Sequence, residues 1–203
     1  MLKKQRWACL LLGFTAFMLL GFTAGMIEPK KWLISESSNL CVNGNTNVNK
    51  FSCEIPACDR TDTLNMTRNK SSKEITLSGN ISLSIQSFDC HNAIMTRDLR
   101  TTLKEKQYPR LRILFLSLSN FPELTEKPQL ITGLVNIEMV GITKRFEVNY
   151  QVSIDDQKVV HLLGTRDINF SDFDLTPPRK LGGLIKTNNK LSVIFHLKIK
   201  ELN

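Results

Sequence analysis

The chain has 203 residues and a formal net charge of +8 at pH 7, and 41% of its residues are hydrophobic. Lysines and arginines are interspersed with aspartates and glutamates rather than gathered into a basic stripe, which argues against nucleic acid as a partner. The length that remains after an N-terminal leader suits one domain with its own hydrophobic core.

The first 25 residues differ from the rest of the chain. Lys3, Lys4 and Arg6 precede an uncharged apolar run that continues to Gly25, as in a secretory signal peptide. The run is longer than the ~7–15 residues of most cleaved signals and close to the ~20 that span a bilayer. We therefore predict a signal peptide at 1–25 and a domain at 26–203. The alternative is an uncleaved anchor that associates with the membrane. In either case the protein is expected to be periplasmic or secreted.

Eight segments beyond the leader are predicted to be β-strands. The clearest is 74–87, where apolar residues from Ile75 to Ile85 alternate with polar ones and Gly79 takes one apolar position. A period of two buries one face of an antiparallel strand, and a glycine within it indicates a bend or bulge. The predicted strands span 32–42, 47–55, 74–87, 111–119, 130–140, 145–154, 158–168 and 191–200.

One amphipathic helix of about four turns is predicted between Asn92 and Pro109. Asn92 can cap its first turn, and Pro109 stops it. Met95, Leu99 and Leu103 recur at four-residue spacing and form its apolar side.

Two polar stretches, 45–48 and 61–73, are predicted to be loops. Many alternating strands with a single helix favour a closed antiparallel barrel over an α/β sheet. The predicted fold is therefore mainly β.

Four cysteines follow the leader, namely Cys41, Cys53, Cys58 and Cys90. An even number in an exported chain predicts two disulfides. Three pairings are possible, of which we favour Cys53–Cys90 with Cys41–Cys58. The spacings contain no CxxC pair, so we predict no metal site.

The adjacent Cys90 and His91 raise the question of thiol chemistry. Neighbouring side chains at a strand end point to opposite sides, so His91 is badly placed to act as the base for Cys90. We predict that Cys90 is half of a disulfide and that His91 is a loop residue. No catalytic residue and no cofactor are predicted. A thiol enzyme that uses Cys90 or Cys58 is the less favoured alternative.

Several motifs resemble, in their order and spacing, those of the YceI-like family over roughly residues 30–200. They are an aspartate on the helix before "YPRLRILF", then "GLVNIEMVGITK", then "TRDINF". The opening "GNTNVNKFSC" is similar to a cysteine-containing variant, and "SSNLCV" stands where many members have a histidine. The matching positions are Asp98, Tyr108, Pro109, Ile113, Phe115, Gly133, Leu134, Gly141, Thr143, Lys144, Arg166 and Phe170.

The resemblance implies a lipocalin-like barrel of eight antiparallel strands, exported in bacteria, with the helix closing one end. It also implies that the lumen holds a long-chain amphiphile and that the protein does no chemistry. The implied ligand is a polyisoprenoid, an isoprenoid quinone or a fatty-acid-like lipid. Eight strands can enclose one small ligand.

Inward-facing apolar residues are therefore the candidate ligand contacts. The alternative is an ordinary packed core, as in a filled barrel that serves as an interaction or adhesion module. The hydroxyl group of Tyr150 is expected to meet a polar head group, or water at a mouth of the barrel. The predicted lumen residues are Leu83, Ile85, Met95, Leu99, Phe115, Met139, Phe146, Val148, Tyr150 and Phe195.

Overall fold

The computed structural model describes residues 30–68 and 74–202, so the signal peptide or anchor predicted at 1–25 lies outside the described residues. Eleven of the described strands form one antiparallel sheet, and two short ones pair with each other apart from it. The strands are β1 Lys30–Ile34, β2 Asn39–Asn45, β3 Lys50–Ile55, β4 Asp62–Arg68, β5 Ile75–Ser78, β6 Asn80–Ser84, β7 Arg110–Leu118, β8 Gln129–Met139, β9 Ile142–Ile154, β10 Val160–Asn169, β11 Arg179–Lys180, β12 Ile185–Lys186 and β13 Lys190–Leu202. The helices are α2 Ala93–Thr102 and the 3₁₀ helices η2 Ile85–Ser87, η3 Phe170–Phe173 and η4 Leu181–Gly183.

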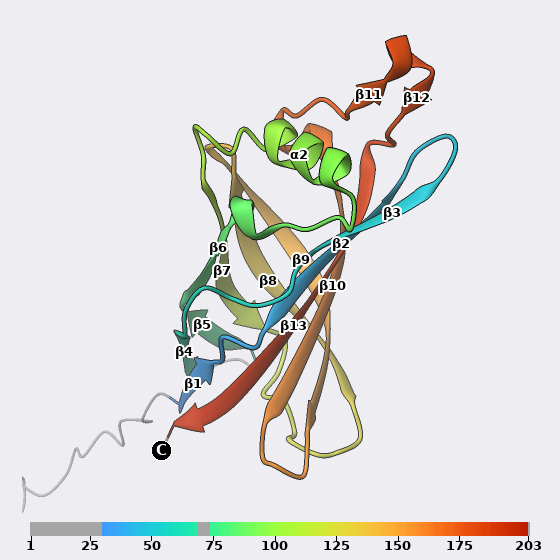
Figure 1. The fold of residues 1–203 in the computed structure, drawn as a ribbon. Coiled ribbons are helices and arrows are strands. Elements are labelled where there is room, and N and C mark those ends of the chain that lie inside the picture. The colour runs from blue at the N-terminus through green and yellow to red at the C-terminus, as the bar shows by residue number, and fades with distance from the viewer. Residues whose placement is uncertain (1–29, 69–73, 203) are drawn as a thin grey trace, which may run out of the picture.

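The sheet closes on itself as an eight-stranded barrel (Figure 1) because β1 pairs with both β4 and β13. Three of the eight positions around the ring are each occupied by two consecutive short strands. These composite strands are β1 with β2, β3 with β4, and β5 with β6. From β7 through β8, β9 and β10 to β13, neighbours in the ring follow the order of the chain. The predicted fold class, a mainly β antiparallel barrel of eight strands with one helix, is confirmed.

Alternate residues of each strand face the barrel interior, as their period of two predicted. In β9, Val148 and Tyr150 are buried, whereas Glu147 and Asn149 are exposed. The bend predicted at Gly79 is also confirmed. This glycine separates β5 from β6 with a φ of +152°, a conformation that glycine adopts more readily than other residues.

The loop predicted at 61–73 is wrong over its first half, because Asp62–Arg68 forms β4. Leu64 and Met66 of this strand point into the barrel and are 0% and 2% exposed. Two apolar residues in a polar stretch make too weak an alternation to predict a strand. Pairing with β1 on one side and β5 on the other supplies the missing stabilisation. The remaining residues, 69–73, lie outside the described part of the chain.

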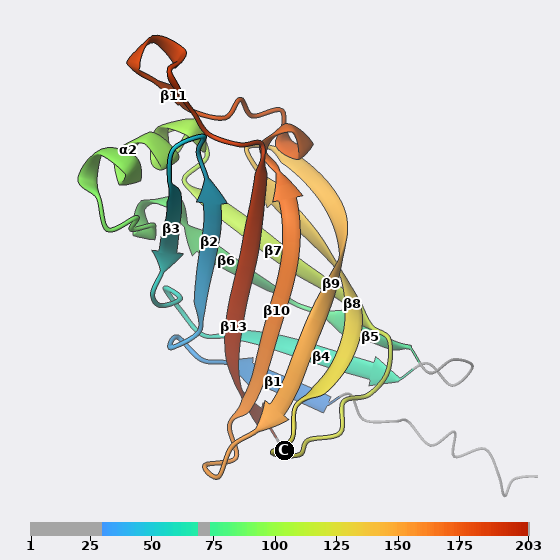
Figure 2. The same ribbon diagram turned by 90° about the vertical axis from the view of Figure 1, so that its right-hand side faces the viewer.

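Helix α2 lies at one end of the barrel (Figures 1 and 2). As predicted, the Asn92 side chain caps it, accepting hydrogen bonds of 3.0 Å from the N–H groups of Ile94 and Met95. The regular helix ends at Thr102 and is shorter than predicted, since tight turns carry the chain over residues 103–107. Within the described residues, no helix has both the length and the apolar character needed to cross a membrane.

At the same end, residues 179–186 form a hairpin arm that projects beyond the barrel (Figure 1). Asn47, in the turn between β2 and β3, fastens this arm to the barrel. Its amide nitrogen donates to the carbonyl oxygen of Leu184 at 2.9 Å, and its amide oxygen accepts from the N–H of Lys186 at 2.9 Å. The arm is thus a fixed part of the barrel mouth.

Candidate ligand-binding site at the barrel mouth

The middle of the barrel is filled by three aromatic side chains that were predicted to face the lumen. Phe115 and Tyr150 each meet Phe195 edge to face, with ring centroids 6.4 Å and 5.8 Å apart. Gly164 lies against the Phe195 ring, and a Cβ atom there would come within 2.2 Å of it. The three rings face inward as predicted, but they pack against one another and close the lumen at this level.

The hydroxyl group of Tyr150 lies inside this cluster rather than at a mouth of the barrel. The residue is 1% exposed, and its oxygen has no hydrogen-bond partner among the described residues. Burial raises the pKa of Tyr150 well above its ordinary value, so the phenol stays neutral. The contact of this hydroxyl with a polar head group or with water therefore stays a prediction.

Above the aromatic cluster the barrel contains an apolar cavity of about 50 Å³, referred to below as the upper cavity. Leu99 and Leu103 reach it from the α2 end, and Met139 contributes to its wall from β8. Apart from Asn169, its lining residues are apolar. The cavity therefore suits a hydrocarbon group.

A larger pocket of about 320 Å³ opens at the barrel mouth, between α2, the turn from β2 to β3 and the hairpin arm. Apolar side chains of this mouth pocket include Phe51, Met95 and Ile185. Leu99 and Phe170 line both the mouth pocket and the upper cavity, so these two side chains form the partition between them. The volume falls at the lower end of the ~300–1,000 Å³ typical of small-molecule sites.

Polar groups lie at the rim of the mouth pocket. The Nζ atom of Lys180 on the arm lies 2.5 Å from Oδ2 of Asp98 on α2, an ion pair that joins two walls of the pocket. On the hairpin side, Thr46 Oγ1 donates to Oδ1 of Asn49 at 2.6 Å. An apolar interior below a polar rim can hold the chain of an amphiphile while its head group remains near water.

The other predicted lumen residues lie away from both spaces. Leu83, Ile85 and Val148 are buried in the barrel wall, at most 1% exposed, and Phe146 packs on Phe173 with ring centroids 6.1 Å apart. The structure therefore brings three of the ten predicted residues to these two spaces: Met95 to the mouth pocket, Met139 to the upper cavity and Leu99 to both.

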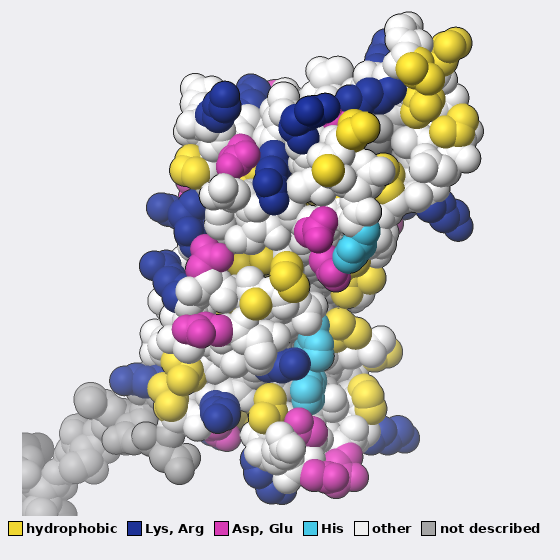
Figure 3. Space-filling view, viewed as in Figure 1, with side chains coloured by type: hydrophobic (Ala, Val, Ile, Leu, Met, Phe, Trp, Pro, Cys, Tyr) yellow, Lys and Arg dark blue, Asp and Glu magenta, His cyan; other side chains and the backbone are white. Residues whose placement is uncertain are grey.

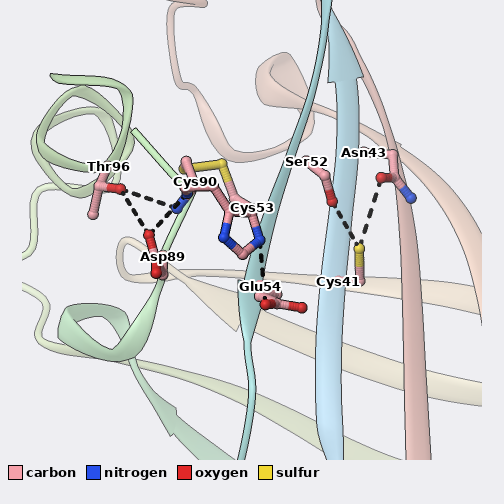
Figure 4. A network of polar contacts seen from close by, with 9 residues as sticks. Cys41, Asn43, Ser52, Cys53, Glu54, Asp89, Cys90 and Thr96 are labelled. Carbon is pink, nitrogen blue, oxygen red and sulfur yellow. Dashed lines mark hydrogen bonds and ion pairs between the residues drawn. A yellow bond between two sulfur atoms is a disulfide. The ribbon is translucent and has the colours of Figure 1, made fainter. Parts of the chain in front are cut away.

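The predicted Cys53–Cys90 disulfide is present and lies beside the mouth pocket (Figure 4). It links β3 to the segment that leads into α2. Next to it, the N–H groups of Glu54 and Asp89 each donate to the carbonyl oxygen of the other, at 2.7 Å and 2.8 Å. These contacts close the upper part of the barrel. Within the described residues, no ladder of strand pairing joins β3 to β6 there.

The predicted Cys41–Cys58 disulfide is wrong, because both thiols are free. Cys41 lies between two inward-facing residues of β2 and so points outward, where its sulfur is 3.2 Å from Ser52 Oγ (Figure 4). Cys58 is buried beyond the end of β3. Its pKa is raised to about 11 by burial and by the nearby charges of Asp59 and Asp62, so the thiol is protonated at neutral pH.

His91 is a loop residue, as predicted. Its Nε2 atom lies 3.3 Å from Oε1 of Glu54, and the side chain is 64% exposed. The other two histidines meet on the outer wall: His161 Nδ1 is 2.8 Å from His196 Nε2, and His161 Nε2 is 3.0 Å from Oδ2 of Asp155. Neither of these two histidines lines the mouth pocket. Over the described ranges, no group of three or more metal-binding side chains is assembled.

An open depression of about 760 Å³ lies along the outer side of α2. Its lining is mostly charged or polar and includes Asp89, Arg97, Arg100 and Glu105. Without an apolar floor it does not suit a hydrocarbon chain.

Most contributors to the mouth pocket were missed as ligand contacts, among them Phe51, Phe170 and Ile185. Phe170 stands in the "TRDINF" motif, so its only signal was the resemblance to the YceI-like family. Phe51 likewise stands in the quoted "GNTNVNKFSC" segment, whereas Ile185 lies outside every predicted element and motif. Their role depends on how the hairpin arm folds over the barrel.

Comparison with known proteins gives matches in structure only. No protein-family model matches the sequence, and neither does any curated protein. The barrel is similar to a polyisoprenoid-binding domain from Saccharophagus degradans, with 11% sequence identity over 83% of this chain and 97% of that one, at a TM-score of 0.61.

Two further solved structures are similar. BcnA from Burkholderia cenocepacia shares 13% identity over 79% of this chain and 95% of its own, at a TM-score of 0.56. A YceI protein of Campylobacter jejuni shares 13% identity over 68% of this chain and 79% of its own, at a TM-score of 0.42. The first two likenesses establish a shared fold, which supports the resemblance to the YceI-like family at the level of the fold.

Proposed function

We propose that this chain is an exported, non-catalytic binding protein that holds one long-chain amphiphile at the mouth of the barrel. The observation that carries the proposal is the pair of adjoining spaces that share Leu99 and Phe170. The head group lies at the polar rim formed by Asp98 and Lys180. The hydrocarbon chain occupies the mouth pocket and passes between the two shared side chains toward the upper cavity.

The ligand class is a polyisoprenoid, an isoprenoid quinone or a fatty-acid-like lipid. A fold shared with a polyisoprenoid-binding domain supports this class. The cluster of Phe115, Tyr150 and Phe195 limits how deep the chain reaches. A ligand longer than the upper half of the barrel therefore keeps part of its chain outside.

The states of the cysteines support binding rather than thiol chemistry. Cys53 and Cys90 are bonded to each other, and burial keeps the Cys58 thiol protonated. The polar partners of Cys41 are Ser52 and Asn43, neither of which is a base. Because disulfides persist in oxidising compartments, the Cys53–Cys90 bond also supports a periplasmic or secreted location.

The aromatic cluster favours one other function, an interaction module built on a filled barrel. In that case the mouth pocket is a surface cleft and no lipid is held. The two functions differ in whether the purified protein binds an amphiphile.

The test is extraction of the purified full chain with organic solvent and mass spectrometry of the extract, followed by titration with a fluorescent fatty acid. Leu99→Trp fills the partition between the two spaces and should weaken binding of the probe at least about tenfold, equivalent to ~1.4 kcal/mol. Thr101→Trp adds the same bulk to an exposed position of the same helix and should bind normally. If the parent protein carries no lipid and binds no probe, the lipid-binding function is excluded in favour of the interaction module.

A further inference from the structure

Four exposed apolar side chains surround the mouth of the barrel. Val48, Ile94, Leu181 and Leu184 are 64%, 59%, 70% and 75% exposed. They make up four of the six large hydrophobic residues that are exposed in the described part of the chain. Figure 3 shows hydrophobic side chains gathered over the hairpin arm. Single exposed hydrophobic residues are ordinary, but a group at one end of the molecule marks an interaction site.

The structure holds these residues together. Besides the two hydrogen bonds of the Asn47 side chain, the N–H of Asn47 donates to the carbonyl oxygen of Lys186 at 3.1 Å, and Thr46 forms a β-bridge with Thr187. The arm therefore extends the hairpin of β2 and β3. Leu181 and Leu184 lie at its end and Val48 in the adjacent turn, and these three residues are called the mouth tip below.

The charged residues in the two segments that form the mouth tip are all positive. The segments 43–52 and 176–190 contain no aspartate or glutamate. Their basic residues are Lys50, Arg179, Lys180, Lys186 and Lys190. Lys180 and Lys190 pair with Asp98 and Asp167, whereas the other three form no ion pair with any described residue.

We propose that the mouth tip docks on an anionic lipid bilayer. Val48, Leu181 and Leu184 enter the headgroup region, and Lys50, Arg179 and Lys186 contact the anionic headgroups. A basic side chain near an anionic membrane surface is attracted to it, and apolar side chains beside it add to the binding. This combination of apolar tip, unpaired cations and missing acids fits a membrane better than a protein partner, which normally presents charges of both signs.

Docking in this orientation places the mouth pocket next to the bilayer, because Val48 lines that pocket. A lipid can then pass between the membrane and the pocket without crossing water. This transfer step rests on the proposed function. The docking itself does not, since it depends only on the exposed side chains and charges of the mouth tip.

The test is hydrogen–deuterium exchange of the full chain, with and without vesicles of phosphatidylcholine that contain phosphatidylglycerol. Exchange is read locally, so membrane binding by the N-terminal segment does not obscure the result. We expect backbone amides of 46–50 and 179–187 to exchange several-fold more slowly on these vesicles. The turn 155–159, at the opposite end of the barrel, should be unaffected. Protection that is equal on vesicles of phosphatidylcholine alone would overturn the role of the cations.

Matched variants separate the two parts of the tip. The double variant Leu181→Ser with Leu184→Ser should lose the protection, whereas Leu130→Ser, which changes a 74% exposed leucine of β8, should keep it. The double variant Lys50→Glu with Lys186→Glu should lose it as well, and Lys158→Glu in the distant turn should not. Protection that persists in both tip variants contradicts the proposal.

Two further outcomes are informative. Protection that appears without vesicles and grows with protein concentration would assign the tip to a second copy of the chain and overturn docking on a bilayer. Lipid extraction is measured separately. A tip that is protected on anionic vesicles in a protein that binds no amphiphile would leave docking intact and remove the proposed function.

Discussion

The lower and upper halves of the barrel are closed in different ways. Below the aromatic cluster, β1 pairs with β4 and β13, and the interior is filled by side chains such as Trp32 and Leu64, at most 1% exposed. Above the cluster, β3 reaches the segment before α2 through one β-bridge and the Cys53–Cys90 disulfide. The upper cavity and the mouth pocket both lie in this less regular half. The space for a ligand thus lies where the strands are paired least. At that place the Cys53–Cys90 disulfide adds the closure that strand pairing does not supply.

The largest effect is expected at the centre of the packed half. Phe195→Ala should lower the free energy of unfolding by about 3–5 kcal/mol, because it removes the ring that both Phe115 and Tyr150 contact. Urea denaturation measures it. Lys200→Ala, at an exposed position of the same strand, should stay within about 0.5 kcal/mol. A loss of about 0.5 kcal/mol or less, the range of a surface change, would show that the cluster does not hold the barrel together.

The next largest effect is expected at the Cys53–Cys90 disulfide, which closes the upper half of the barrel. Replacing both Cys53 and Cys90 with serine should cost about 2–4 kcal/mol, since the disulfide closes a loop between residues 37 apart in sequence. Binding of a fluorescent fatty acid should weaken too, because Cys53 lines the mouth pocket. Urea denaturation and probe titration give the two readouts.

Cys41→Ser is the control for the disulfide variant, because Cys41 is a free cysteine whose side chain points out of the barrel. It should leave both stability and probe binding near those of the parent. If this control lost as much stability as the double variant, the upper half would not depend on its covalent link.

The sequence predicted the packed half of the barrel better than the open one. Alternation in segments such as 145–154 is a local property, and it gave the strands, their inward faces and the fold class. The strand at Asp62–Arg68 was not predicted because only two apolar residues, Leu64 and Met66, mark its inner face. The mouth pocket depends on contacts between distant segments. Residues near 50, 95, 170 and 185 meet there only after the chain has folded.

The cysteines show the same limit. The Cys53–Cys90 pairing was chosen correctly among three possibilities, but spacing alone could not show that Cys41 occupies an outward position of β2. That orientation follows from the register of Cys41 opposite Glu54 of β3 and Ile194 of β13. Register between strands is a property of the assembled sheet.

A smaller effect is expected at the rim. Asp98→Asn removes the ion pair with Lys180 and should cost only about 0.2–1 kcal/mol, since the side chains are 22% and 44% exposed. Local opening of the hairpin arm should increase, seen as faster deuterium uptake over 179–187. Asp167→Asn breaks a comparable pair with Lys190 away from the arm and should leave that uptake unchanged. Equal uptake in both variants would show that the contacts of Thr46 and Asn47 hold the arm without this ion pair.

The smallest effect is a pH dependence on the outer wall. His161 hydrogen-bonds to both His196 and Asp155, so a proton on each imidazole would bring two N–H groups face to face at 2.8 Å. Burial, then the charges of His161 and Lys198, hold the pKa of His196 below the ordinary value of about 6.5 for histidine. The unfolded chain therefore binds more protons below that pH, and stability should fall as the pH drops from 6.5 through the folded pKa and then level off. The Asp155 carboxyl, whose pKa is lowered chiefly by its hydrogen bond with His161, adds a separate fall in stability at more acidic pH, below 3.8.

Urea denaturation at several pH values should show that stability depends less steeply on pH in His196→Gln than in the parent. His91→Gln, far from this pair, should keep the pH dependence of the parent. If His196→Gln also left the pH dependence of stability unchanged, the histidine pair would be excluded as its source.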